Sequence, residues 1–197
     1  MKKASFTLRL LAFLIDMIIL IVISSILTQG LISKKTEKLN DKLQNSITEY
    51  TSGEITVDDY MTQVQDITYE LQKTSFAANL VETLLFIAYF IVFQFLNKGQ
   101  TLGKKLIKIK VVNEEDDEAN IFQIIIRTLF VDQILINLLL VILVKVLTKS
   151  TYMQVYYIVT AIYYLFILVT CIMMLYRKDK LSLHDIMSRT KVVKEGK

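Results

Sequence analysis

Four long apolar stretches alternate with polar, charged stretches along this chain of 197 residues. The hydrocarbon core of a bilayer is about 30 Å thick, so a helix needs about 20 apolar residues to cross it. The stretches long enough are residues 6–28, 75–96, 121–147 and 152–176. Only a short connection joins the last two. The pattern predicts an all-α membrane protein with four transmembrane helices in two hairpins.

Composition supports this class and excludes others. Hydrophobic residues make up 53% of the chain and charged residues 21%, and the charged residues cluster between the apolar stretches. A soluble globular enzyme, a disordered chain and a disulfide scaffold are therefore excluded. The chain has no proline and five glycines. Because many transporter sites lie where Gly or Pro interrupts a membrane helix, we expect continuous helices without such breaks.

The basic residues predict the orientation of the chain in the cell membrane. Fifteen of the 23 Lys and Arg residues fall on one side of a four-span arrangement, in the N-terminal segment, the loop 97–120 and the tail 177–197. The loop 30–74 holds five of the rest, and Lys145 and Lys149 lie near the connection between the third and fourth spans. Cytoplasmic loops carry the excess of positive charge, so both termini are predicted to be cytoplasmic in a multi-pass protein.

The loop 30–74 has a helical pattern of its own. Leu39, Leu43 and Ile47 recur every four residues, and a second periodic stretch follows Thr56, which has Asp59 three residues on, as in a capping box. We expect an extracytoplasmic hairpin of two amphipathic helices. Two interpretations remain open: a helical stalk that packs on itself, and a surface that binds a protein partner.

The cytoplasmic segments contain two short apolar and basic stretches. Residues 107–112 alternate between apolar and basic, and residues 190–193 are similar, so the two are candidates to pair as a small β-ladder. The preceding glycine-rich stretch, residues 99–105, lacks the spacing and the Ser or Thr of a phosphate-binding loop.

Several kinds of chemistry are not expected. One cysteine, Cys171, excludes an internal disulfide, and one histidine, His184, excludes a multi-histidine metal site. No nucleophile and base pair or metal set is visible in the spans, so neither an enzyme nor a bound cofactor is predicted. The excess of Lys and Arg is typical of the cytoplasmic loops of a membrane protein, so nucleic-acid binding is not expected.

Ionisable groups in the spans are the main candidates for function. Each costs about 2.5–3.5 kcal/mol to insert, so each needs a partner or a role. They are Arg9, Asp16, Glu82, Arg127 and Asp132. These acids and arginines either join the helices through buried pairs or line a path for a cation or proton. The sequence leaves both interpretations open.

Three motifs resemble the RDD family of small bacterial membrane proteins. Arg9 and Asp16 are similar to its first-span motif, and Leu183-His184-Asp185 is similar to its closing motif. The second motif lies in the cytoplasmic loop, where the candidate positions are Gly99, Thr101, Gly103 and Lys104. The resemblance covers most of the membrane part. The long first loop is a departure, and Glu82 and Asp132 have no counterpart in these motifs.

The resemblance implies transport. Family members are suspected transporters, some linked to sodium/proton antiport, so we expect a small cation transporter. Asp16 would bind the cation or proton, Arg9 would tune its charge, and Glu82 and Asp132 would extend the path. Four spans are few for a carrier, so a homodimer is expected. For His184 and Asp185, a proton relay and a cap that holds the tail against Arg9 remain open. The alternative function is a non-transporting membrane partner or accessory subunit.

Overall fold

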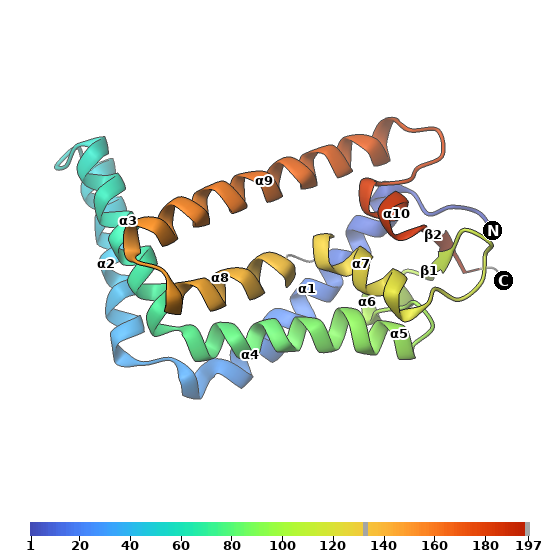
Figure 1. Cartoon of the computed structure of the whole chain (residues 1–197), viewed down its shortest axis with the longest axis horizontal. Helices are drawn as coiled ribbons and strands as arrows, with labels where there is room; N and C mark the ends of the chain where they lie inside the picture. Colours follow the sequence, from blue (N-terminus) through green and yellow to red (C-terminus); the bar gives the residue numbers. More distant parts are fainter. Residues whose placement is uncertain (132–133, 196–197) are drawn as a thin grey trace.

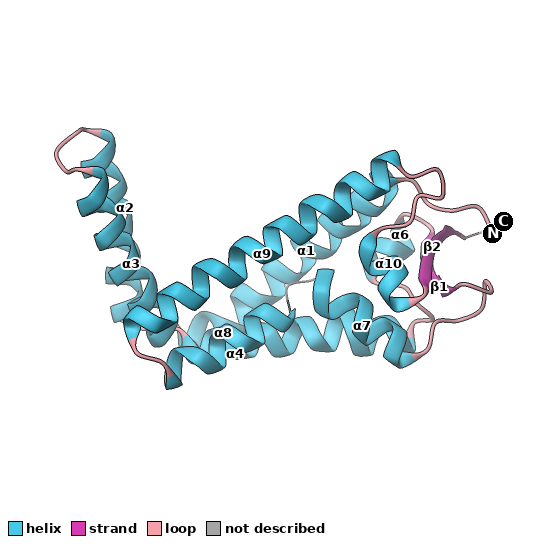
Figure 2. Cartoon of the chain, turned by 45° about the horizontal axis from the view of Figure 1, so that its top comes forward, coloured by secondary structure: helices cyan, strands magenta, loops and turns pink. Residues whose placement is uncertain are grey.

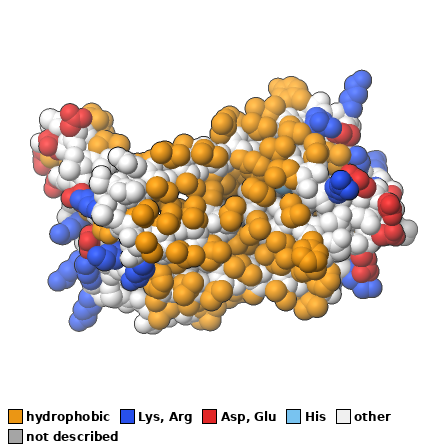
Figure 3. Space-filling view, in the orientation of Figure 1, with side chains coloured by type: hydrophobic (Ala, Val, Ile, Leu, Met, Phe, Trp, Pro, Cys, Tyr) orange, Lys and Arg blue, Asp and Glu red, His pale blue; other side chains and the backbone are white. Residues whose placement is uncertain are grey.

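The structure is a computed structural model that describes residues 1–131 and 134–195. Long apolar helices lie along its longest axis, with a helical hairpin at one end and a small sheet at the other (Figure 1). Both chain termini lie at the end that carries the sheet (Figures 1 and 2). Apolar side chains cover the middle of the visible face, and charged side chains gather at the two ends (Figure 3). This distribution is typical of a membrane-spanning protein.

Three helical stretches in the described residues are each long and apolar enough to cross a membrane, and a bent helix pair raises the number to four. The first predicted span, residues 6–28, has the same bounds as helix α1. The fourth predicted span, residues 152–176, corresponds to helix α9, which begins three residues earlier. The elements of the three continuous stretches are α1 (Phe6–Thr28) with η1 (Gln29–Leu31), α4 (Phe76–Ile87) with η2 (Ala88–Phe93) and α5 (Gln94–Leu96), and α9 (Lys149–Tyr176).

The third predicted span is broken, so the expectation of continuous helices is wrong there. It consists of α7 (Ile121–Val131) and α8 (Ile134–Val146), whose axes differ by 66°. The absence of glycine and proline from this stretch does not prevent a bend, because helices also bend for other reasons. The two halves pack against different neighbours: α7 contacts α10 (Leu183–Ser188) at the sheet end, whereas α8 contacts α4 and α9. Asp132 lies outside the described residues.

The second span also departs from a regular α-helix. Its segment η2 is a π-helix, which inserts between α4 and α5. Such segments are rare and occur frequently at functional sites. Here the π-helix carries Tyr89, a buried polar residue at the candidate site described below.

The loop between the first two spans forms the predicted helical hairpin. Its helices are α2 (Lys34–Thr51) and α3 (Val57–Thr74), which pack on one another and project from the bundle (Figure 2). The predicted capping box at the start of α3 is confirmed, because Thr56 and Asp59 exchange both hydrogen bonds. Helix α3 also contacts α4, α8 and α9, so the hairpin is joined to the membrane part.

A two-stranded antiparallel sheet closes the opposite end. Strand β1 (Ile109–Asn113) pairs with β2 (Thr190–Lys194), with Val111 opposite Val192. The predicted β-ladder is therefore confirmed, and the all-α class needs this correction. Apolar side chains of both strands are buried against the N-terminal half of α1, which includes Ala12. The sheet thus ties the tail and the loop 97–120 to the first span.

Candidate functional site

Asp16 is buried near the middle of α1 and is held by three donors. The hydroxyl of Tyr89 donates to its Oδ1 at 2.5 Å, the hydroxyl of Thr101 donates to its Oδ2 at 2.5 Å, and the backbone N–H of Gly103 donates to Oδ1 at 2.7 Å. Only 1% of Asp16 is exposed. A carboxylate with both oxygens occupied by donors fixes those donors in place. Asp16 therefore joins three segments: α1, η2 and α6 (Leu102–Leu106).

Gly103 allows α6 to lie directly on α1. A Cβ at this position would be 2.2 Å from the backbone oxygen of Ala12 and 2.8 Å from Oδ1 of Asp16. The hydroxyl of Thr101 also accepts a hydrogen bond from the backbone N–H of Lys104, which caps the start of this short helix. Small residues on both elements permit the close approach, and the carboxylate then reaches the backbone of α6.

Asp185 is fully buried and pairs with two arginines from different spans. Arg9 Nη1 donates to its Oδ2 at 2.6 Å, and Arg127 Nη1 donates to its Oδ1. The same residue forms a capping box with Ser182, which sets the start of α10 and orients the carboxylate. Two cations share one carboxylate, so this triad of Arg9, Arg127 and Asp185 carries a net positive charge.

The pKa values of Asp185 and His184, both in α10, follow from this arrangement. Burial raises the pKa of Asp185, but the positive charges of Arg127 and Arg9 lower it by more than burial raises it. The pKa of Asp185 therefore lies below its usual range. Burial, followed by the charge of Arg127, lowers the pKa of His184 well below its usual value. His184 is therefore neutral at pH 7. Because the Nη2 of Arg127 lies 3.2 Å from its Nε2 and can only donate, the ring proton is assigned to Nδ1.

Stability should fall as the pH falls from 7 to 5. His184 binds a proton in the unfolded chain below about pH 6.5 but resists protonation when folded, so acid favours unfolding in this window. The neighbours that face it include Arg127, Arg9, Lys104 and Asp185. The measurement is the unfolding temperature in nonionic detergent between pH 5 and 8.

The variant His184→Gln is the control for this pH dependence. Glutamine can still accept from Arg127 but does not titrate, and the chain has no other histidine. We expect a flatter pH profile for this variant. An unchanged slope would contradict the assignment to His184.

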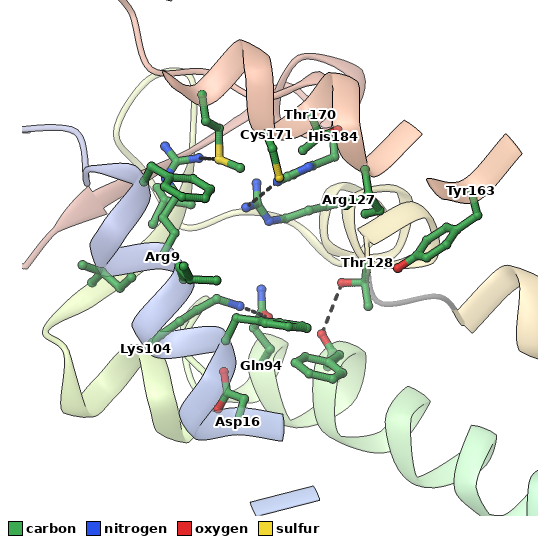
Figure 4. Close-up of a pocket in the computed structure, with 18 of the residues that line it drawn as sticks. Arg9, Asp16, Gln94, Lys104, Arg127, Thr128, Tyr163, Thr170, Cys171 and His184 are labelled. Carbon is green, nitrogen blue, oxygen red and sulfur yellow. Dashed lines mark hydrogen bonds between the residues drawn. The ribbon is translucent and has the colours of Figure 1, made fainter. Parts of the chain in front are cut away.

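An inner cavity of about 400 Å³ lies beside the triad and Asp16. Its residues come from six helices, α1, α5, α6, α7, α9 and α10, from the π-helix η2 and from both strands of the sheet. Ten of them are labelled in Figure 4. Its charged residues are Arg9, Asp16, Lys104 and Arg127, and much of the remaining wall is apolar. Nζ of Lys104 donates to Oε1 of Gln94 at 2.7 Å in this wall.

An outer cavity of about 300 Å³ lies nearer the helical hairpin, and Glu82 is the only charged residue that lines it among residues 1–131 and 134–195. The remaining polar lining residues are Gln72, Asn79, Thr83, Asn137, Tyr156, Thr160 and Tyr164. Tyr164 lines both cavities, so the inner and outer cavities adjoin there. Among the described residues, Glu82 makes no hydrogen bond or ion pair.

The structure brings together all three motifs. Arg9 and Asp185 pair, so a cap that holds the tail against Arg9 is present. Arg9 makes no direct pair with Asp16 in the described structure, because its guanidinium is paired with Asp185 of the tail. Nor do the acids form one polar interior, since Asp16 and Glu82 line different cavities.

Gly99 has a structural role in the loop 97–120. It has a φ of +84°, and a Cβ there would be 2.2 Å from the backbone oxygen of Val111. Its carbonyl accepts from the N–H of Val111, and its own N–H donates to the carbonyl of Gln94. Gly99 therefore turns the chain from the second span into the sheet.

Sequence reasoning missed several polar residues that complete the site. Tyr89 and Gln94 were detectable as polar groups within an apolar span, and Ser182 as a cap three residues before Asp185. Thr190, whose hydroxyl accepts from Nη1 of Arg127 at 3.0 Å, gave no signal beyond its place in a short strand. The side chain of Thr170 was equally inconspicuous on α9.

Comparison with known proteins gives one match. The sequence model of the RDD family matches residues 3–189, which is nearly the whole chain. The match includes Arg9, Asp16 and Asp185 and the hairpin α2–α3. No curated protein and no solved structure matches the chain.

Proposed function

The chain belongs to the RDD family and is an integral membrane protein, and we propose that it carries a small cation, such as sodium, across the cell membrane in exchange for protons. The observation that carries this proposal is Glu82 in the outer cavity. A carboxylate within a membrane span is costly unless it has a partner or a role. Glu82 has no partner among the described residues and faces amide and hydroxyl groups. Oxygen atoms of these kinds are the ligands that hard cations prefer.

The composition of the outer cavity suits a transient site. The described residues contain no group of three or more His, Cys, Asp or Glu side chains placed to hold a metal ion. One carboxylate with neutral oxygens favours weak binding, which a transported ion needs in order to leave. Glu82 also has the chemistry to exchange a proton for the cation, because a carboxylate is either protonated or free to bind.

The second half of the route requires another conformation. From the outer cavity an ion passes Tyr164 and then meets Arg9 and Arg127, whose shared net charge opposes a cation. The break between α7 and α8 lies between the parts that form the two cavities. We propose that these two half-helices move relative to one another during transport, as discontinuous helices do in other carriers.

The orientation and assembly follow from the same proposal. The termini and the sheet lie at one end, with most of the basic residues, so we assign that end to the cytoplasm and the hairpin α2–α3 to the outside. A homodimer is expected because four spans are few for a carrier.

The test is ion flux in proteoliposomes with Glu82→Gln. Protein in vesicles with an internal pH dye is challenged with sodium, potassium or lithium salts. We expect a cation-driven pH change whose rate falls at least about tenfold in Glu82→Gln, because the variant lacks the carboxylate that we propose binds the cation and the proton, and a tenfold change in rate corresponds to about 1.4 kcal/mol. Asp16→Asn is a poorer test, because Asp16 also holds α6 and Tyr89.

A matched control is Glu115→Gln, at an exposed position in the turn before α7. It should keep the full rate. Absence of flux from folded wild-type protein would refute transport and favour the alternative function, a non-transporting partner. The projecting hairpin α2–α3, where Tyr50 and Tyr60 stack at 4.7 Å near its tip, is the surface that such a role would use.

A further inference from the structure

The inner cavity contains four buried polar atoms that make no hydrogen bond in the described structure. They are Nε of Arg9, Nε2 of Gln94, Oγ1 of Thr170 and Nδ1 of His184. Thr170, Gln94 and His184 are 3%, 1% and 4% exposed. Buried polar groups nearly always have partners, so four in one cavity indicate a ligand.

All four atoms are able to donate. The Nε of an arginine and the amide nitrogen of Gln94 carry hydrogens, and the amide oxygen of Gln94 already accepts from Lys104. Nδ1 of His184 carries the ring proton, because its Nε2 accepts from Arg127. A hydroxyl such as that of Thr170 donates or accepts. A ligand that satisfies all four therefore presents hydrogen-bond acceptors.

The charge of the cavity wall favours an anion. Arg9 and Arg127 share the single carboxylate of Asp185, so one positive charge of the triad is not balanced within it. Water would satisfy donors but would not balance that charge. A phosphate or carboxylate group does both, and guanidinium groups bind these anions especially well.

The remaining wall indicates an attached hydrocarbon chain. Phe6, Leu10 and Phe13 of α1 and Ile167 of α9 line the same cavity. Leu10 and Phe13 are about 40% exposed, so the wall continues onto the bilayer-facing surface of α1. A lipid therefore has a continuous apolar path from the bilayer to the donors. A volume of about 400 Å³ falls within the usual range of small-molecule sites.

We propose that the inner cavity binds an anionic amphiphile, with its phosphate or carboxylate head group among Arg9, Gln94, Thr170 and His184 and its acyl chain between α1 and α9. The source is a membrane lipid of the leaflet nearest the sheet. This site is distinct from the outer cavity and does not depend on cation transport.

Cys171 is a built-in reporter for this site. It lines the inner cavity, it is partly buried, and it is the chain's only cysteine. The rate of its modification by a maleimide is measured by intact mass in nonionic detergent. The probes are dodecyl phosphate, dodecyltrimethylammonium and inorganic phosphate at equal concentrations.

Dodecyl phosphate should slow modification at least about tenfold, and the other two probes should have little effect. Equal protection by inorganic phosphate would overturn the lipid source, because the anion alone would then suffice. Equal protection by dodecyltrimethylammonium, or no protection by any probe, would overturn the anionic site.

Thr170→Val tests the placement of the head group. It removes one donor with little change in volume, so the concentration of dodecyl phosphate that gives half protection should rise about tenfold. Thr160→Val is the matched control, because Thr160 lies on the same helix but lines the outer cavity. Equal effects of the two substitutions, or none from Thr170→Val, would overturn the proposed contact.

Discussion

Replacing Asp185 with asparagine should cause the largest loss of stability of any single substitution considered for this protein. Asp185 is fully buried and balances Arg9 and Arg127, which come from the first and third spans. Asparagine keeps a similar shape but leaves two buried cations facing one another. Removing one partner of a buried ion pair costs about 3–5 kcal/mol, a large part of the total stability of many proteins. The readouts are the yield of monodisperse protein in detergent and its unfolding temperature.

Asp179→Asn is the matched control for this substitution. Asp179 pairs with Arg177 at 2.6 Å, as Asp185 pairs with Arg9, but both partners are exposed to solvent. Exposed ion pairs contribute little, so this variant should behave like the wild type. If the unfolding temperature of Asp185→Asn lies within about one degree of the wild type, other groups balance the charges of the two arginines. The triad would then not be what holds these elements together.

The contrast between the two buried aspartates explains what the sequence was able to predict. Asp16 was identified as an unusual charge within a span, and Asp185 through its resemblance to the closing motif of the family. Their different partners were not predicted, because Asp16 is held by Tyr89, Thr101 and a backbone N–H that are all distant in sequence. Asp185 recruits arginines 176 and 58 residues away. Spacing along one helix reports which residues share a face, but it does not report which other helix lies opposite.

Local patterns predicted local structure well. Apolar length identified the membrane stretches, four-residue periodicity identified α2 and α3, and alternation identified β1. The break between α7 and α8 was missed, because its cause is not a proline or glycine in the sequence; the two halves pack on different elements. The two cavities were equally out of reach, because their walls combine side chains from several helices.

Gly103→Ala should separate the loop 97–120 from the first span. The added Cβ would lie 2.2 Å from the backbone oxygen of Ala12, which cannot rotate away as a side chain would. Helix α6 must therefore shift, and the hydrogen bond from the N–H of Gly103 to Asp16 is lost or lengthened. Overpacking costs about 1–3 kcal/mol, and a hydrogen bond to a charged group contributes about 1.5–3 kcal/mol. We expect a clear fall in the unfolding temperature and faster hydrogen exchange of the backbone amides in α6.

Gly30→Ala is the control for the same chemical change, since a Cβ at Gly30 meets no atom within 4 Å. It should leave both readouts unchanged. Normal exchange in α6 of Gly103→Ala would mean that the loop tolerates the shift and that Asp16 does not depend on this contact. Loss of protection confined to α6 would instead show that Asp16 holds the loop against the first span. The inner cavity would then change too, because Lys104 in its wall belongs to the same short helix.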